Sequence, residues 1–147
     1  MPMNRAMVAQ VLHNLETSPK TDYDSTFDDV NESVWYQEAV NWATNKGIVA
    51  GYGNGMFGAK DNITREQFVT ILYNYAKSSE YDVNVEENTN ILSFKDFEKI
   101  SDYANSAFKW AGEKGIMNGS DGDLNLKGAA TRAEVASMMY KFCLNIR

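Results

Sequence analysis

The stretch FDDVNESVWYQEAVNWATNKGIVAGYGNGMFGAKDNITREQFVTILYNYA occupies residues 27–76, and its pattern returns at residues 94–143 as FKDFEKISDYANSAFKWAGEKGIMNGSDGDLNLKGAATRAEVASMMYKFC. The matching positions keep the same order and are spread along the whole of each stretch. In the first copy they are Phe27, Asp29, Ala39, Trp42, Ala43, Lys46, Gly47, Ile48, Gly51, Thr64, Arg65 and Tyr73. Chance agreement of this extent is very unusual, so the chain contains an internal repeat.

The second half of the repeat occurs a third time at the start of the chain. There Arg5, Val8, Val11, Leu12 and Leu15 correspond to Arg65, Phe68, Ile71, Leu72 and Tyr75. We therefore expect five segments: the C-terminal half of a first repeat (1–16), a polar linker (17–26), a second repeat (27–77), an acidic linker (78–92) and a third repeat (93–147). The first repeat is incomplete.

Each full repeat has the pattern of helix, loop and helix. In the second repeat Trp35, Ala39, Trp42 and Ala43 fall on one face of a helix, and Tyr103, Ala107, Trp110 and Ala111 are their counterparts in the third. Gly47 and Gly115 follow these stretches, where a left-handed residue closes a helix. The sequence therefore predicts an all-α fold.

The second helix of each repeat carries a start signal. Thr64 with Gln67, and Thr131 with Glu134, have the spacing of a capping box, while Asn4 can cap the earlier copy. The apolar stripes that follow are Phe68, Ile71, Leu72 and Tyr75, and later Val135, Met138, Met139 and Phe142. Cys143, the single cysteine, extends this last stripe, and we expect it in the core.

At this point the sequence closely resembles the S-layer homology family. The resemblance is carried by FDDVNESVWYQEAVNWATNKGIVAGYGNGMFGAKDNITREQF, by FKDF, FKWAGEKGIMNG and ATRAEV, and by NRAMVAQVLHNLE as the end of another repeat. It implies helical repeats packed around a pseudo-threefold axis. It also implies attachment to the bacterial wall through an anionic, often pyruvylated, secondary cell-wall polysaccharide held in grooves between repeats.

The resemblance also implies which residues contact the glycan. Family members use the arginine that opens the second helix, together with acidic, tryptophan and glycine positions of the repeat. In this sequence the matching residues are Arg5, Arg65, Arg132, Asp29, Trp35, Gly51, Asp96, Tyr103 and Gly119. Tyr103 replaces the tryptophan in the third repeat. One groove would combine Arg5 with Asp29 and Trp35, another Arg65 with Asp96 and Tyr103, and Arg132 would lack its counterpart.

A physical interpretation of Arg5, Arg65 and Arg132 agrees with the role that the resemblance implies. The first position of a helix is unfavourable for a cation, because the positive end of the helix dipole and unpaired N–H groups lie there. Arginine, helix N-terminus and loop amides could together hold a carboxylate. The alternative is a structural arginine that pairs with Asp29, Asp96 or another carboxylate, or simply a solvated side chain.

The aromatic and acidic candidates also have two interpretations. Trp42 and Trp110 fit core packing, whereas Trp35 could pack at an interface or stack on a sugar. Asp29 and Asp96 fit helix entry or loop ordering better than ligand contact, because a bare carboxylate repels an acidic glycan, and they could instead orient an arginine. Gly51 and Gly119 serve the loop backbone and would allow close approach of a ligand.

The composition of the chain narrows the classes of partner that it could bind. The chain has 44% hydrophobic residues, enough for a core, and a net charge of −6, which disfavours nucleic acid and anionic membranes. Its apolar runs are too short to span a bilayer, and its start does not resemble a signal peptide. If the protein is exported to the wall or S-layer, we expect this chain to be a fragment of it.

The sequence favours a binding module over an enzyme. His13, the only histidine, lies in the middle of a helix, and no triad, Cys-His pair or zinc spacing is present, so we expect neither catalysis nor a cofactor or metal. A second interpretation stays open: a structural or self-association module without glycan affinity. A second copy of the chain could then complete the missing half-repeat by association or swapping.

Overall fold

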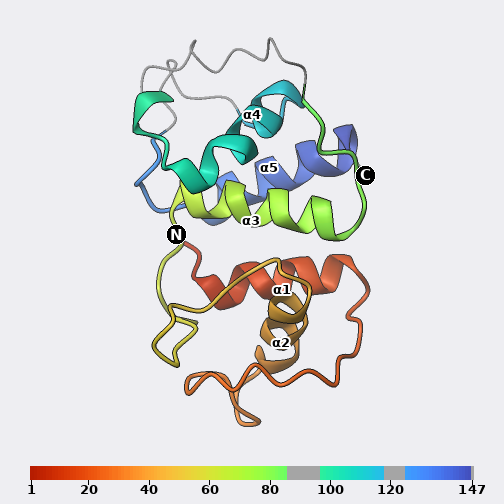
Figure 1. The fold of residues 1–147 in the computed structure, drawn as a ribbon, viewed down its shortest axis with the longest axis vertical. Helices are drawn as coiled ribbons and strands as arrows, with labels where there is room; N and C mark the ends of the chain where they lie inside the picture. Colours follow the sequence, from red (N-terminus) through yellow and green to blue (C-terminus); the bar gives the residue numbers. More distant parts are fainter. Residues whose placement is uncertain (86–96, 118–124, 147) are drawn as a thin grey trace. The chain divides into compact units, whose positions relative to one another are not determined.

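The chain folds into helices joined by turns and irregular segments. The computed structural model describes residues 1–85, 97–117 and 125–146. Within these ranges the elements are α1 (Arg5–Leu15), α2 (Gln37–Asn45), α3 (Arg65–Ser78), the 3-10 helices η2 (Phe97–Lys99) and η3 (Asp102–Ala104), α4 (Asn105–Glu113) and α5 (Arg132–Asn145) (Figure 1). β contacts in the same ranges are isolated bridges. The helical prediction is confirmed for the described residues.

The chain divides into two compact units whose boundaries do not follow the sequence repeat. The N-terminal unit is Met3–Asn62, and the C-terminal unit consists of Met1–Pro2 and Ile63–Arg147. In the first, α1 packs against α2; in the second, α3 packs against α4 (Figure 1). We call the first helix of a repeat its opening helix (α2 and α4) and the second its closing helix (α1, α3 and α5). The closing helix of one repeat is therefore the packing partner of the opening helix of the next repeat.

The predicted start signals form as expected. The side chain of Asn4 accepts a hydrogen bond from the Met7 amide at 2.8 Å. The capping boxes of Thr64 with Gln67 and of Thr131 with Glu134 are complete, because each threonine accepts from the third amide of the helix and each partner accepts in return. These caps fix the first residue of α1, α3 and α5 as Arg5, Arg65 and Arg132.

The opening helices of the repeats end on left-handed glycines. Gly47 follows α2 with φ of 73°, and Gly115 follows α4 with φ of 70°. Both values lie in the region that glycine adopts without steric cost. The chain reverses here, and the following isoleucines, Ile48 and Ile116, are buried. The prediction that Gly47 and Gly115 end these helices in the left-handed conformation is confirmed.

Aromatic side chains fill the cores of both units. In the C-terminal unit Trp110 contacts Tyr73 and Phe142, and Phe142 also contacts Tyr75. In the N-terminal unit the ring of Trp42 lies 5.3 Å from that of His13. Trp42 and Trp110 are both buried, which confirms their prediction as core residues.

His13 is structural. Its side chain is buried, and its Nε2 lies 2.8 Å from the Pro19 carbonyl oxygen. This contact helps to hold residues 17–26 against α1. The same segment is tied to α2 by Glu38, which accepts from the Thr21 amide, and by Asn41, which accepts from Ser25.

Two local expectations differ from the structure. The opening helices begin at Gln37 and Asn105 rather than at the aromatic residues, because short turns precede them: the Asn31 side chain accepts from Ser33 ahead of α2, and η3 precedes α4. Cys143 is exposed, so its prediction as a core residue is wrong. It lies on a face of α5 that no described element covers.

The two classes of tryptophan should respond differently to truncation. We expect Trp110→Ala to lower the free energy of unfolding by roughly 3–5 kcal/mol, because it leaves a large cavity. The same change at Trp35, which is 63% exposed, should lower the free energy of unfolding by no more than about 0.5 kcal/mol. Urea denaturation followed by circular dichroism measures both, and a similar loss in the two variants would contradict the assigned core.

Candidate functional site

The same backbone pairing fixes the start of each closing helix. The amide of its first arginine donates to the carbonyl of a segment distant in sequence: Arg5 to Asp61 at 3.0 Å, Arg65 to Gly128 at 3.0 Å and Arg132 to Met1 at 2.9 Å. An isolated antiparallel bridge lies beside each of these bonds: Asn4–Asn62, Thr64–Ala129 and Pro2–Thr131. The arginine side chains therefore leave the backbone where a helix begins and an irregular segment is anchored.

The guanidinium of Arg5 is enclosed by the loop between α2 and α3. Its Nε donates to the Phe57 carbonyl at 3.0 Å and its Nη2 to the Ala50 carbonyl at 2.6 Å. The charged group also lies 4.8 Å from the ring centre of Tyr52 and 4.6 Å from that of Phe57. Burial lowers the pKa of Arg5, opposed by the attraction of Tyr52, Asp61 and Asp29. Arg5 holds the loop in shape.

Asp29 orders the same loop from its other side. Its carboxylate accepts hydrogen bonds from the amides of Phe57, Gly58 and Ala59 at 2.8–2.9 Å. Burial works against ionisation of Asp29, but the amide bonds, led by that of Ala59, outweigh it, and the pKa lies below the ordinary value of 3.8. The interpretation of Asp29 as a loop-ordering residue is confirmed. Asp96, its counterpart, lies outside the described residues.

Gly51 is required by packing within this loop. A Cβ placed on Gly51 would lie 2.3 Å from a ring carbon of Phe27 and 3.1 Å from the Met56 carbonyl oxygen. The aromatic ring occupies the space that a side chain would need. Gly51 therefore serves the loop itself, as expected; its counterpart Gly119 lies outside the described residues.

Arg65 stands in a more open setting. It lines a pocket of about 240 Å³ within the C-terminal unit. The other lining residues come from the segment after α4 and from α5: Ile116, Met117, Ala133, Glu134, Ser137, Met138 and Lys141. One Nη of Arg65 forms an ion pair with Glu134, whereas its buried Nε has no hydrogen-bond partner among the described residues. The side chain keeps 18% of its surface exposed.

The Arg65 pocket has the chemistry of a small anion site. Arg65 and Lys141 bring two cations against the single carboxylate of Glu134. The free Nε offers a donor that burial makes costly to leave unpaired. Ser137 adds a hydroxyl, and Ile116, Met117 and Met138 supply an apolar wall. The pocket could hold one acidic substituent beside a methyl or methylene group.

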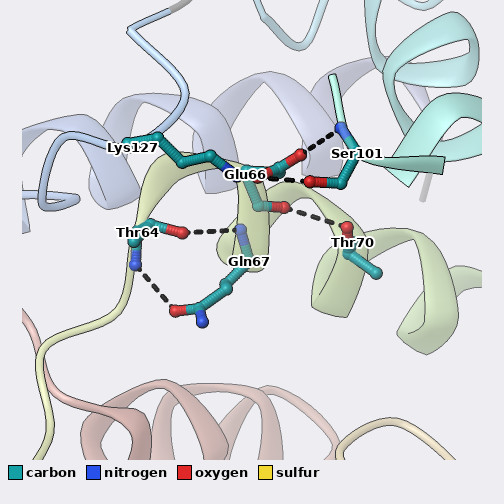
Figure 2. Close-up of polar contacts among 6 residues, drawn as sticks. All are labelled: Thr64, Glu66, Gln67, Thr70, Ser101 and Lys127. Atoms are coloured by element: carbon teal, nitrogen blue, oxygen red, sulfur yellow. Dashed lines mark hydrogen bonds and ion pairs between the residues drawn. The ribbon is translucent and has the colours of Figure 1, made fainter. Parts of the chain in front are cut away.

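A buried carboxylate lies next to Arg65 in sequence. Glu66 is fully buried at the start of α3, where it accepts from the Ser101 amide at 2.6 Å and pairs with Lys127 (Figure 2). Burial raises its pKa, but the bonds from Lys127 and Ser101 prevail and hold it below the ordinary value of 4.5. This cluster ties α3 to the segments that precede α4 and α5.

The remaining candidates are exposed. Trp35 and Tyr103 are 63% and 58% exposed. Tyr103 neighbours Glu66 and Lys127, and burial together with the Glu66 charge raises the pKa of its hydroxyl. Arg132 is exposed at the start of α5. The structure thus brings Arg5 and Asp29 to one loop, and it places Arg65 in a pocket with residues of α5.

Sequence reasoning missed several contributors. Glu134 was expected only as a capping partner, and Lys141 of the pocket, Tyr52 over Arg5 and the Glu66–Lys127 pair were not singled out. One signal was present: Glu66 stands where the other closing helices have Ala6 and Ala133. An acidic residue at a position otherwise occupied by alanine indicates a local partner.

Within the described ranges, no group of three or more His, Cys, Asp or Glu side chains could hold a metal ion. The helices found in those ranges are also too short or too polar to cross a membrane.

Comparison with known proteins identifies the family. Residues 26–69 and 93–136 match the model of the S-layer homology domain. In the described residues the fold is a repeat-built helical module with an arginine at the start of α1, α3 and α5. The chain belongs to the S-layer homology domain family.

Relatives carry this module within longer proteins. The chain is 36% identical over 92% of its length to exoglucanase XynX of Acetivibrio thermocellus, of which it spans 12%. It is 32% identical over 90% of its length to a cellulosome-anchoring protein of the same organism and spans 29% of it. With an S-layer protein of Bacillus licheniformis the values are 31% identity, 93% of this chain and 14% of the relative.

The lowered carboxylate pKa values predict acid sensitivity. A carboxylate whose pKa falls on folding contributes stability that is complete above its unfolded pKa and is lost as pH falls through its folded pKa. For Asp29 and Glu66 the loss should therefore begin near pH 4 and deepen below it. Melting temperature measured from pH 7 to pH 2 checks this.

The Asp29→Asn variant isolates one of these contributions. At pH 7 it should be about 1–3 kcal/mol less stable than the parent, because an amide accepts through one oxygen only and its NH₂ group would face amide donors. The difference should shrink toward pH 2. Asp28→Asn, at the exposed neighbouring residue, should match the parent throughout. A constant Asp29→Asn deficit at every pH would contradict the assignment.

Proposed function

We propose that this chain is a non-catalytic module that anchors its protein to the bacterial cell wall outside the cell. Membership of the S-layer homology family supports this, as do relatives whose names describe cellulosome anchoring and S-layers. Relatives named as enzymes extend far beyond the part that this chain matches. Their activities give no reason to assign catalysis to these repeats.

The ligand in this proposal is a peptidoglycan-linked anionic wall polysaccharide, with a ketal-linked pyruvate as the group recognised. The observation that carries it is the Arg65 pocket. In a chain of net charge −6, an acidic polymer needs a local cationic site, and Arg65 with Lys141 provides one. The pyruvate carboxylate would meet the unpaired Nε of Arg65. Its methyl group would face Met117 and Met138.

The other candidate residues take supporting positions. Arg5, Asp29 and Gly51 shape the first loop from within, while Trp35 and Tyr103 offer exposed rings on which a sugar face could stack. Arg132, Asp96 and Gly119 complete the proposed set. Arrangement of the repeats around a pseudo-threefold axis is part of the same proposal. It is supported by the recurrence of one backbone bridge at the start of α1, α3 and α5.

A second function is favoured by one observation. The face of α5 that carries Tyr140 is exposed, as a self-association module without glycan affinity would require. If the chain forms homo-oligomers through this face, its apparent molar mass should rise as the protein concentration rises. Self-association would not depend on pyruvylation of the wall polysaccharide.

Charge removal in the pocket tests the glycan proposal. We expect Arg65→Gln to weaken binding to purified, pyruvylated wall polysaccharide by about tenfold to a hundredfold, the equivalent of a lost charge-assisted hydrogen bond. Lys141→Gln should cause a smaller loss. Binding by the parent should also weaken as salt rises. Isothermal titration calorimetry measures these affinities.

Two controls make this result specific. Lys109→Gln removes the same charge from an exposed site on α4 and should bind like the parent. Chemically depyruvylated polysaccharide should bind the parent as weakly as it binds Arg65→Gln. Equal affinity of Arg65→Gln and the parent, with both variants equally helical, would remove Arg65 from recognition.

A further inference from the structure

Glu134 makes two different contacts at the start of α5. Its Oε1 accepts hydrogen bonds from the Thr131 amide at 3.3 Å and from the Thr131 hydroxyl at 2.9 Å, which belong to the capping box of the helix. Its Oε2 forms the ion pair with Nη2 of Arg65. The first contact lies within α5, whereas the second joins α5 to the first residue of α3. One carboxylate therefore links a helix cap to the cation of the proposed binding pocket.

The capping box does not require a negative charge at this position. On α3 the equivalent residue is Gln67, whose side-chain oxygen accepts from the Thr64 amide at 3.0 Å, while the Gln67 amide donates to the Thr64 hydroxyl at 3.1 Å (Figure 2). A neutral side chain thus completes the same box. What distinguishes the charge of Glu134 is the group that its second oxygen meets, the guanidinium of Arg65.

This ion pair uses a donor that a ligand carboxylate would also need. Nε and Nη2 of a guanidinium carry parallel N–H groups, and a carboxylate that binds side-on accepts one hydrogen bond from each. In Arg65, Nη2 is paired with Glu134, whereas the buried Nε has no hydrogen-bond partner among the described residues. A ligand carboxylate on these two nitrogens would either displace Glu134 or lie beside a second negative charge. Both alternatives lower its affinity.

The balance of charge in the pocket leads to the same conclusion. Arg65 and Lys141 each contribute a positive charge to its lining, and Glu134 offsets one of them. The side chains of Arg65 and Glu134 keep only 18% and 24% of their surface exposed, so water screens their charges in part. An anion that enters the pocket therefore meets a weaker positive field than Arg65 and Lys141 alone would provide.

We propose that Glu134 is an internal competitor for the Arg65 guanidinium and thereby sets the affinity and selectivity of the pocket. This inference rests on the proposed function, because it treats the same pocket as the site of a ligand carboxylate. Without a ligand, Glu134 gives the largely buried guanidinium an anionic partner. A small free carboxylate such as acetate makes too few contacts to displace Glu134. A carboxylate carried by a polysaccharide has further contacts with the protein that offset the loss of the ion pair.

Replacing Glu134 by its neutral isostere in the full chain tests this role. In Glu134→Gln the capping box should persist, as it does with Gln67 on α3, and the melting temperature should fall by no more than about 3 °C. We expect this variant to bind purified, pyruvylated wall polysaccharide about tenfold more tightly than the parent, because a like charge beside the ligand is removed. Isothermal titration calorimetry measures the affinity, and circular dichroism measures the melting temperature.

A second probe tests Glu134 independently of the polysaccharide. Sodium acetate, titrated at constant ionic strength, supplies a carboxylate alone, and the nuclear magnetic resonance signal of the Arg65 Nε–H group reports its binding. We expect acetate to bind Glu134→Gln about tenfold more tightly than the parent. If neither protein binds the polysaccharide but acetate still distinguishes them in this way, the proposed wall ligand is wrong and the role of Glu134 is supported.

Two matched variants make the gain in affinity specific. Glu98→Gln removes the same charge from an exposed residue of the same unit and should bind acetate and polysaccharide like the parent. Arg65→Gln combined with Glu134→Gln should lose the gain, because the competition acts through Arg65. Equal acetate affinity of Glu134→Gln and the parent would overturn the proposal. Weaker binding by Glu134→Gln would overturn it as well, because Glu134 would then hold Arg65 in place for the ligand.

Discussion

The hydrogen bond from the amide of a helix-opening arginine to a distant carbonyl is the constraint on which the rest of the structure depends. The first amides of a helix have no partner within it. Here they pair instead with segments far away in sequence, such as Asp61 for Arg5 and Gly128 for Arg65. One bond therefore caps a helix, anchors a loop and sets the place from which a guanidinium extends. The same solution recurs at α1, α3 and α5.

Equivalent positions have different chemical surroundings. Arg5 gives its donors to the carbonyls of Phe57 and Ala50 and is buried under aromatic rings. Arg65 retains a donor without a described partner and lines a pocket with Lys141. The repeat fixes where the arginine stands, and the side chains that differ between repeats decide what its guanidinium meets: backbone carbonyls for Arg5, and the Glu134 carboxylate and the pocket for Arg65.

Local rules predicted much of this arrangement, whereas tertiary partners decided the rest. Capping boxes at Thr64 and Thr131 and the left-handed Gly47 depend on neighbouring residues, so their sequence signals were sufficient. The exposure of Cys143 was not predictable from its apolar stripe, because burial requires a covering helix. The pairing of Glu66 with Lys127 joins residues distant in sequence, and the pocket residues Glu134 and Lys141 acquire their significance only when α5 lies near Arg65.

The most direct measurement is nuclear magnetic resonance of the arginine Nε–H groups while a pyruvylated wall oligosaccharide is titrated into the full chain. If the Arg65 pocket captures the ketal carboxylate, the Arg65 resonance should shift strongly and saturate with the binding curve. The Arg5 resonance, bonded to Phe57, should shift much less. Binding that leaves the Arg65 resonance unchanged, or an identical shift with the depyruvylated oligosaccharide, would contradict this mechanism.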